Sequence, residues 1–366
     1  MNNNNTNCVI VVIGPSRSGT AIIMQVLESL GMISSQSMIP TKENDSIAAY
    51  EDPEIFRIQE KLSGQNTVDA MAPPAGWLDK NETHKIEQEL KEILEVRMQN
   101  IPTVFGFKDP RTALFLPLWT KIFNELNITP LYVLATREPQ SVIKSMAKQW
   151  NVNESVTELF WLTNNTEALR QTGGNCFIAH YEDWFSEKAP EIAEQLLEYT
   201  GLDKFWDSSE NIADVLPEAV RSGLDAPVYN GYEVKNRYVV KLHRQLRQCS
   251  GYRFDRQALM EVVMECREAM GEFAGWVFEA HRLLRQCNVG MVREKHVLGA
   301  NKYLQRCKDL GDENENLRIR LSVIETALKA RDRKMFYMIT STSFKVGKKI
   351  ADTLTKLCKS TMPFFI

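Results

Sequence analysis

The sequence predicts an α/β fold in which a parallel sheet is flanked by helices, with a C-terminal α-helical and coiled-coil extension. In the first half of the chain, short apolar runs rich in valine and isoleucine alternate with segments of helical periodicity. A chain of 366 residues, 43% of them hydrophobic, can also bury the large core that such a sheet needs. A parallel sheet of this kind binds ligands at the carboxyl ends of its strands.

Four pairs of a strand and a following helix are expected before residue 206. The strands lie within 8–14, 103–110, 130–139 and 175–184, and the helices within 19–31, 114–126, 141–150 and 189–201. After about Trp206 the strand signals stop, and from Val234 the sequence has the pattern of long, polar helices. We therefore expect a core over 1–206, a helical segment over 207–290 that completes or flanks it, and the extension over 291–366.

The extension carries an apolar heptad pattern followed by a lysine-rich amphipathic segment. From Tyr303 to Met335, apolar residues recur at the two seam positions of a coiled coil, with Asn314 at one of them. The pattern predicts a homodimer, although a solvated helix packed on its own domain would show it too. Residues 344–359 alternate lysines with apolar side chains, which fits either peripheral contact with the inner membrane surface or a terminal helix docked on the chain.

Charge and cysteine usage restrict the class of protein. A formal net charge of -3 gives no electrostatic reason to expect nucleic acid as a partner. The seven cysteines are scattered singly, without a Cys-x-x-Cys pair, which fits reduced intracellular thiols. The start of the chain carries no cationic segment, and its first apolar run is too short for a signal peptide or a membrane span. We expect a cytoplasmic protein.

The stretch "CVIVVIGPSRSGTA" joins the first strand to the first helix through a glycine-bounded turn. Gly14 and Gly19 permit close approach of backbone N–H groups to an anion, and the positive end of the helix dipole points at the same place. A nucleoside triphosphate loop has a lysine directly after its second glycine, and here Thr20 stands there. The cation lies inside the loop instead, as Arg17, whose guanidinium suits one phosphate or sulfate group.

These loop residues, "PSRSGT", resemble the 5′-phosphosulfate loop of the sulfotransferases, which use 3′-phosphoadenosine 5′-phosphosulfate (PAPS) as donor. That family follows a later strand with an arginine and, on the next helix, a serine that both grip the donor's 3′-phosphate; "TREPQSVIKS" supplies Arg137 and Ser145 at the matching spacing. The resemblance implies a metal-free donor site, with backbone N–H groups completing the phosphate cradle. Its residues would be Arg17, Ser18, Gly19, Thr20, Arg137 and Ser145.

Two further stretches carry the resemblance. The residues "GFKDPR" at 106–111 resemble the lysine-bearing turn of bacterial carbohydrate sulfotransferases and of protein-tyrosine sulfotransferases, and "HYEDW" at 180–184 resembles a late strand end of the family. Ala21 and Glu138 depart from the family pattern, which more often has a threonine and an aspartate there. Neither departure removes a charge that the chemistry needs. The resemblance implies a carbohydrate or glycolipid acceptor.

Sulfonyl transfer needs a base for the acceptor hydroxyl and cations for the leaving phosphate. We assign Arg17 to the leaving phosphate and Lys108, which follows a strand, to the transferring group or to orientation of the base. Sulfotransferases use a histidine or a glutamate as base, and Glu51 in "AAYEDPEIF" is our candidate. Alternatively, Glu51 only caps the helix that begins near Asp52.

Several other residues have a structural interpretation beside the functional one. Asp109 and Arg111 could touch substrate or only form an ion pair that fixes the turn. His84 is expected on a solvated helix face and His180 in the core. Trp77, in a proline-stiffened segment, could stack on a sugar or pack into the core.

Two other functions stay open from the sequence alone. One is a metal-dependent kinase of a small molecule built on the same sheet and loop, which the missing loop lysine disfavours. The other is a non-catalytic scaffold of a surface-polysaccharide assembly that presents the coiled coil and the basic tail.

Overall fold

The structure is a computed structural model that describes residues 7–34, 50–63, 73, 76–100, 104–150, 152–207, 209–222 and 232–271. The strands are β1 (Cys8–Ile13), β2 (Phe105–Lys108), β3 (Thr129–Thr136) and β4 (Phe177–His180). The heptad pattern and the lysine-rich segment lie outside the described residues, so the dimer and the membrane contact stay predictions.

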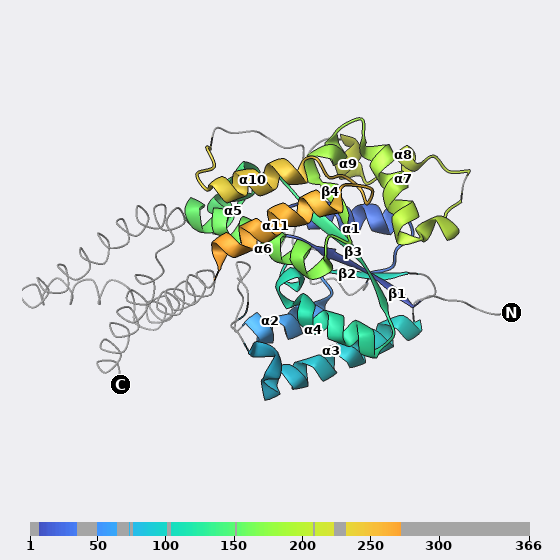
Figure 1. Ribbon diagram of the computed structural model, residues 1–366. Coiled ribbons are helices and arrows are strands. Elements are labelled where there is room, and N and C mark those ends of the chain that lie inside the picture. Colours follow the sequence, from blue (N-terminus) through green and yellow to red (C-terminus); the bar gives the residue numbers. More distant parts are fainter. Residues whose placement is uncertain are drawn as a thin grey trace, which may run out of the picture. The chain divides into compact units, whose positions relative to one another are not determined.

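Helices fill most of the remaining described chain (Figure 1). As far as β4 they are α1 (Thr20–Ser29), α2 (Pro53–Ser63), η1 (Trp77–Asp79), α3 (Asn81–Asn100), α4 (Thr112–Glu125), α5 (Pro139–Trp150) and α6 (Glu154–Thr172). After β4 they are η2 (Tyr181–Phe185), α7 (Ala189–Thr200), η3 (Leu202–Lys204), α8 (Ile212–Val215), α9 (Glu218–Ser222), α10 (Arg237–Leu246) and α11 (Arg256–Met270).

The four strands form one parallel sheet in the order β2-β1-β3-β4, which confirms the predicted α/β class. β1 lies in the interior of the sheet, with β2 and β3 as its neighbours. In register, Val12 of β1 is paired with Lys108, and Ile13 with Leu134 of β3. The carboxyl ends of β1, β2 and β3 therefore meet at one edge, where the loop after β1 begins.

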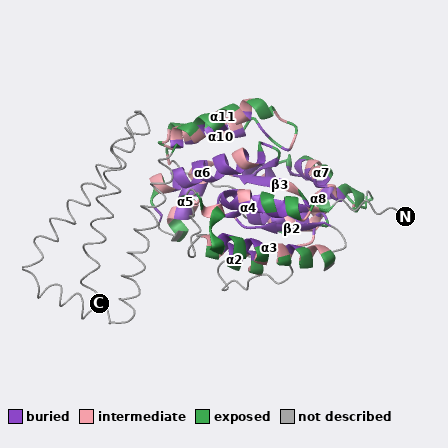
Figure 2. Cartoon of the chain, turned by 60° about the horizontal axis from the view of Figure 1, so that its bottom comes forward, coloured by how far each residue is buried: buried purple, intermediate pink, exposed green. Residues whose placement is uncertain are grey.

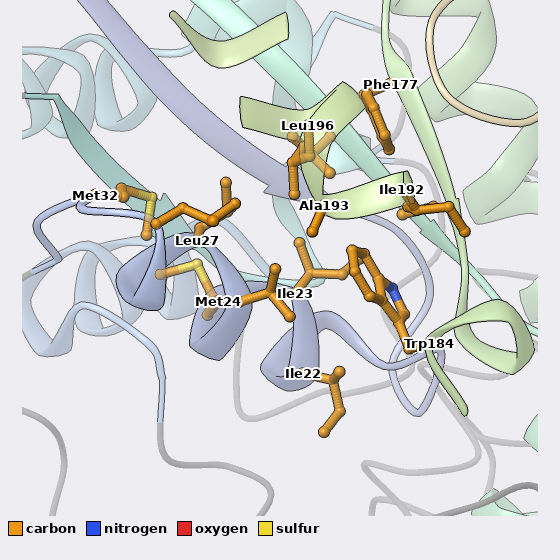
Figure 3. Packing of buried hydrophobic residues seen from close by; sticks show 14 of the residues in the cluster. Ile22, Ile23, Met24, Leu27, Met32, Phe177, Trp184, Ile192, Ala193 and Leu196 are labelled. Carbon is orange, nitrogen blue, oxygen red and sulfur yellow. The ribbon is translucent and has the colours of Figure 1, made fainter. Parts of the chain in front are cut away.

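Both faces of the sheet are buried. Successive side chains of a strand point to opposite faces, and in β1 the consecutive residues Val9 to Ile13 are all buried. On one face, Ile10 and Val133 belong to a buried apolar cluster with residues of α1 and α7. Figure 3 shows part of this cluster, with Ile23 and Leu27 of α1 and Ile192 and Leu196 of α7. On the other face, the ring of Phe107 lies 4.8 Å from that of Trp119 on α4. Burial on both sides explains why the strand sequences are continuous apolar runs rather than alternating ones.

α6 is the helix that the sequence did not predict. The polar side chains in its middle are buried as deeply as the apolar ones, as the purple of this helix in Figure 2 reflects. They include Thr163, Asn164, Asn165 and Thr166. A helix that is covered on all sides, by α4, α5, α10 and the sheet, shows no amphipathic periodicity. Buried polar side chains therefore left no apolar periodicity in the sequence by which this helix could be predicted.

The chain divides into two compact units, Met1–Glu268 and Ala269–Ile366. Helices α8, α9 and α10 belong to the same unit as the sheet, and α10 packs on α6. Gly251 also forms an isolated antiparallel bridge with Ile178 of β4. Among the described helices, none is long and apolar enough to cross a membrane.

Candidate active site

The loop between β1 and α1 packs so tightly against β3 and η2 that two of its residues have no room for a side chain. Gly14 has a φ of 133°, and a Cβ there would lie 2.3 Å from the carbonyl oxygen of Ala135 on β3. Gly19 has a φ of 89°, and its Cβ would lie 2.3 Å from the ring of Tyr181. Only glycine fits both positions, because the conformation and the space each exclude a side chain. The loop is thereby held between β3 and η2 at the start of α1.

This loop presents a helix N-terminus to the edge of the sheet. The first backbone N–H groups of α1, beginning at Thr20, have no partners within the helix, as at any helix start. The N–H of Ser18, in contrast, donates to the Pro15 carbonyl at 3.2 Å inside the loop. Of the predicted cradle, Ser18 therefore offers its hydroxyl, whereas the start of α1 offers backbone N–H groups to an anion.

Three residues predicted for the donor site come together here. Arg17, which has a φ of 70°, donates from Nε to the hydroxyl of Ser145 on α5 at 2.8 Å. Arg137, directly after β3, donates from Nη1 to the carbonyl of Arg17 at 3.2 Å. Residues separated by more than a hundred positions in the sequence thus form one cluster, which we call the arginine cluster: Arg17, Arg137 and Ser145.

Aromatic side chains hold Arg137 in place. Its guanidinium lies 4.0 Å from the centroid of the Tyr181 ring, and the indole N–H of Trp161 donates to its backbone carbonyl at 3.1 Å. Tyr181 therefore contacts both the loop, at Gly19, and the arginine cluster. Sequence reasoning noticed Tyr181 only as part of "HYEDW" and missed Trp161, which lies on the unpredicted α6.

Several buried polar atoms in this region have no hydrogen-bond partner among the described residues. They include two donors, the hydroxyl of Ser18 and Nε of Arg137, together with the Thr136 hydroxyl and Oε2 of Glu182. An unpaired buried donor is costly, so such atoms call for an explanation, and an anionic ligand supplies one. The arrangement of glycines, a helix start and unpaired donors fits a phosphate or sulfate group.

On the other side of β1, Lys108 forms a buried ion pair with Glu51. Lys108 Nζ lies 2.9 Å from Glu51 Oε1, and the two side chains are 3% and 11% exposed. Burial raises the pKa of the Glu51 carboxyl above its ordinary value, and the charge of Lys108 opposes this effect. A carboxylate with a raised pKa is a better proton acceptor near neutral pH.

The helix start beside this pair is capped by Asp52. Its Oδ1 accepts from the backbone N–H groups of Glu54 and Ile55, at 2.9 and 3.1 Å. Its Oδ2 accepts from Arg97 on α3 at 3.1 Å. The capping role that was the alternative for Glu51 is thus filled by its neighbour, and the Glu51 side chain faces Lys108.

The remaining candidates have structural partners. Arg111 binds Asp109 in a buried ion pair with a shortest distance of 2.6 Å, as in the structural interpretation of this turn. His180 is buried, and its Nε2 lies 2.7 Å from the Cys249 carbonyl oxygen; burial lowers its pKa. His84 is half exposed beside Glu87, and the Trp77 ring lies 5.6 Å from that of Phe115. The described residues include no group of three or more His, Cys, Asp or Glu side chains that could hold a metal ion.

Comparison with known proteins gives structural likeness only. No family model matches the chain, and no curated protein matches it. Among solved structures, the chain is similar to the sulfotransferase domain from the curacin biosynthetic pathway, with 15% identity over 66% of this chain and 98% of that one, and a TM-score of 0.38. It is also similar to the sulfotransferase domain of the Synechococcus PCC 7002 olefin synthase, with 14% identity over 72% and 96%, and a TM-score of 0.36.

The fold and the site together define an α/β protein with a glycine-bounded loop at the edge of its parallel sheet, beside the arginine cluster. Structural similarity at 14–15% sequence identity does not define a function, so the function follows from the residues of the site.

Proposed function

We propose that the protein is a sulfotransferase that moves a sulfonyl group from PAPS to an acceptor hydroxyl. The observation that carries the proposal is the arginine cluster beside a loop that has no lysine after its second glycine. A nucleotide with phosphates at both the 5′ and the 3′ positions has two separate anions. Arg17 with the start of α1 would bind one, and Arg137 with Ser145 would bind the other. A nucleoside triphosphate has no second anion of this kind.

The residues present fit the donor. The Arg17 guanidinium and the N–H groups at the start of α1 would bind the 5′-phosphate, with the Ser18 hydroxyl as a further donor. Arg137 and Ser145 would bind the 3′-phosphate. PAPS supplies a sulfonyl group attached to a phosphate that can leave as an anion. The part of this chain is to hold that phosphate and to stabilise the charge that develops on it.

Glu51 and Lys108 would serve the acceptor side. We assign Glu51 as the general base that takes the proton from the acceptor hydroxyl, because burial has raised its pKa and its carboxylate lies at the carboxyl edge of the sheet, beside Lys108. Lys108 Nζ holds one carboxylate oxygen of Glu51 and thereby orients the base. The same ammonium would stabilise negative charge on the sulfonyl oxygens.

For the acceptor we propose a hydroxyl of a carbohydrate or glycolipid. The resemblance of residues 106–111 to the turn of bacterial carbohydrate sulfotransferases supports this choice. The extension beyond residue 290, with its lysine-rich end, would suit an acceptor anchored at a membrane.

Incubation with donor carrying a radiolabelled sulfonyl group, a panel of saccharide acceptors and a metal chelator tests the proposal. We expect label to appear in a saccharide, and an Arg17→Ala variant to abolish the transfer. Arg244→Ala, at an exposed position on α10, is the matched control and should transfer label as the wild type does. Transfer of phosphate from labelled ATP in the presence of magnesium, with no sulfonyl transfer, would establish a kinase instead.

A further inference from the structure

Helix α2 and the residue Glu51 before it are attached by polar contacts to the end of β2, the following turn and α4. In order along the chain, the contacts are Glu51 with Lys108, the Phe56 carbonyl with Arg111, and Gln59 with Thr112 and Trp119. Glu51 precedes α2 by two residues, the Phe56 carbonyl lies in the first turn of the helix, and Gln59 lies three residues further on, so the contacts run from the start of α2 to its middle. The position of Glu51 against Lys108 is therefore tied to the seating of the whole helix.

Arg111 is the central contact of this row and is itself buried. It grips the Asp109 carboxylate with Nε and Nη2, at distances from 2.6 to 3.2 Å. The same Nη2 donates to the carbonyl of Phe56 at 2.9 Å, and the guanidinium carbon lies 4.2 Å from the centroid of the Phe56 ring. A planar fork held by two bonds to a carboxylate is rigid, so Arg111 transmits the position of the turn to α2.

We propose that Arg111 is a positioning residue that holds the N-terminal end of α2, and with it the Glu51 carboxylate, against Lys108. The inference rests on the proposed function, in which Glu51 is the base. Arg111 acts on Glu51 through the backbone of α2 at Phe56. A base must stay within hydrogen-bond reach of its proton, and a displacement of about 1 Å can lower a rate by about 100-fold.

The charges around Glu51 give the inference a spectroscopic signature. The groups that face Glu51 are Lys108, Asp109 and Arg111, and the neighbouring Asp52 is bound by Arg97 from α3. The charge of Asp109 raises the pKa of Glu51, whereas that of Arg111 lowers it. Removing Arg111 takes away the lowering charge and leaves Asp109 without its partner, so both changes raise the pKa of Glu51.

The test compares Arg111→Gln and Arg111→Lys with the wild-type full-length chain, and uses Arg57→Gln, at an exposed position on α2, as the matched control. NMR of isotope-labelled glutamate carboxyls follows the titration of Glu51, whose signal is the one missing in Glu51→Gln. Hydrogen exchange follows the N–H groups of Glu54 and Ile55 at the start of α2. Neither measurement needs an acceptor.

We expect Arg111→Gln to raise the pKa of Glu51 and to speed exchange at the start of α2 by about tenfold. Arg111→Lys should leave the pKa of Glu51 close to its wild-type value, since the substitution keeps the positive charge. It should not restore the slow exchange, since an ammonium lacks the planar fork of a guanidinium. If Arg111→Gln does not fold, the Asp109→Asn/Arg111→Gln variant, which removes the ion pair as a whole, should show the same faster exchange.

Unchanged titration and unchanged exchange in the Arg111 variants would overturn the inference. The proposed function fails on a different result, namely near-wild-type turnover of Glu51→Gln. If Glu51→Gln is inactive while Arg111→Lys turns over at the rate of Arg57→Gln, the base assignment stands and the positioning role is wrong.

Discussion

The two sides of the site differ in what their cations contact. On the β3 side, Arg17 donates to the hydroxyl of Ser145, and Arg137 contacts a backbone carbonyl and the face of Tyr181. On the β2 side, Lys108 binds Glu51 and Arg111 binds Asp109. A guanidinium that donates to a hydroxyl or lies on a ring can also bind an anionic ligand, whereas a cation in a close ion pair orients its carboxylate and tunes the pKa of that carboxylate. One side is therefore suited to binding the donor and the other to accepting a proton.

The largest effect expected from this difference is on turnover when the carboxylate of the β2 side is removed. Glu51→Gln should lower kcat by about 10²–10⁴-fold, the usual contribution of a general base, while binding of adenosine 3′,5′-bisphosphate stays unchanged. Steady-state kinetics together with calorimetry on the same protein measure both. A variant that loses donor binding along with turnover would mean that the two sides are not separate.

The wild-type pH profile sharpens the same point. The pKa of Glu51 is raised by burial, so kcat/KM should rise with pH through a value above the ordinary 4.5 of a glutamate and then level off. This rise should be absent in the residual activity of Glu51→Gln. A profile that is flat from pH 4 upwards in the wild type would assign the base to another group.

A smaller effect is expected on the β3 side. Arg137→Ala should lower the affinity for adenosine 3′,5′-bisphosphate by roughly 10- to 100-fold, the range for a lost charged hydrogen bond. The affinity for AMP should stay almost unchanged. Calorimetry with both nucleotides measures the difference, and Arg244→Ala on α10 serves as control. Equal weakening of both nucleotides would place Arg137 at the 5′-phosphate or in the fold, not at a 3′-phosphate site.

The last effect is on folding stability rather than on binding or turnover, and it concerns the loop between β1 and α1. Gly19 and Gly31 both have positive φ, but a Cβ at Gly19 would clash with Tyr181, whereas at Gly31 no atom lies within 4 Å. Each change to alanine should cost about 1 kcal/mol for the backbone, and Gly19→Ala about 1–3 kcal/mol more for the clash. Chemical denaturation of both variants gives the two free energies of unfolding. Equal losses of unfolding free energy in the two variants would show that the Tyr181 side chain can move aside and does not hold the loop.

The sequence predicted more of the β3 side than of the β2 side. Arg137 and Ser145 were predicted from the family resemblance of "TREPQSVIKS", and the parallel sheet brings Arg137 to the same edge as Arg17 because adjacent parallel strands end there. The contact of Arg111 with Phe56 does not follow, since it joins a turn to a helix 55 residues away through a backbone carbonyl. No local pattern marks such a contact.

Some elements of the fold were likewise predictable from the sequence and others were not. Strands buried on both faces appeared as apolar runs and were predicted, as was the helical character of the chain after Trp206. α6 was missed because its buried Asn164 and Asn165 donate to carbonyls of their own helix, and polar residues in a sequence suggest a solvated surface. Local periodicity reports burial only where burial is apolar.

The central claim is that this loop and the arginine cluster bind a nucleotide with two separate phosphates. Isothermal titration calorimetry of the wild-type chain with adenosine 3′,5′-bisphosphate, AMP and ATP tests it most directly. We predict that the bisphosphate binds at least about tenfold more tightly than AMP and ATP, with or without magnesium, in line with one additional charged hydrogen bond. Equal affinity for the bisphosphate and AMP, or tightest binding of ATP with magnesium, would contradict the account.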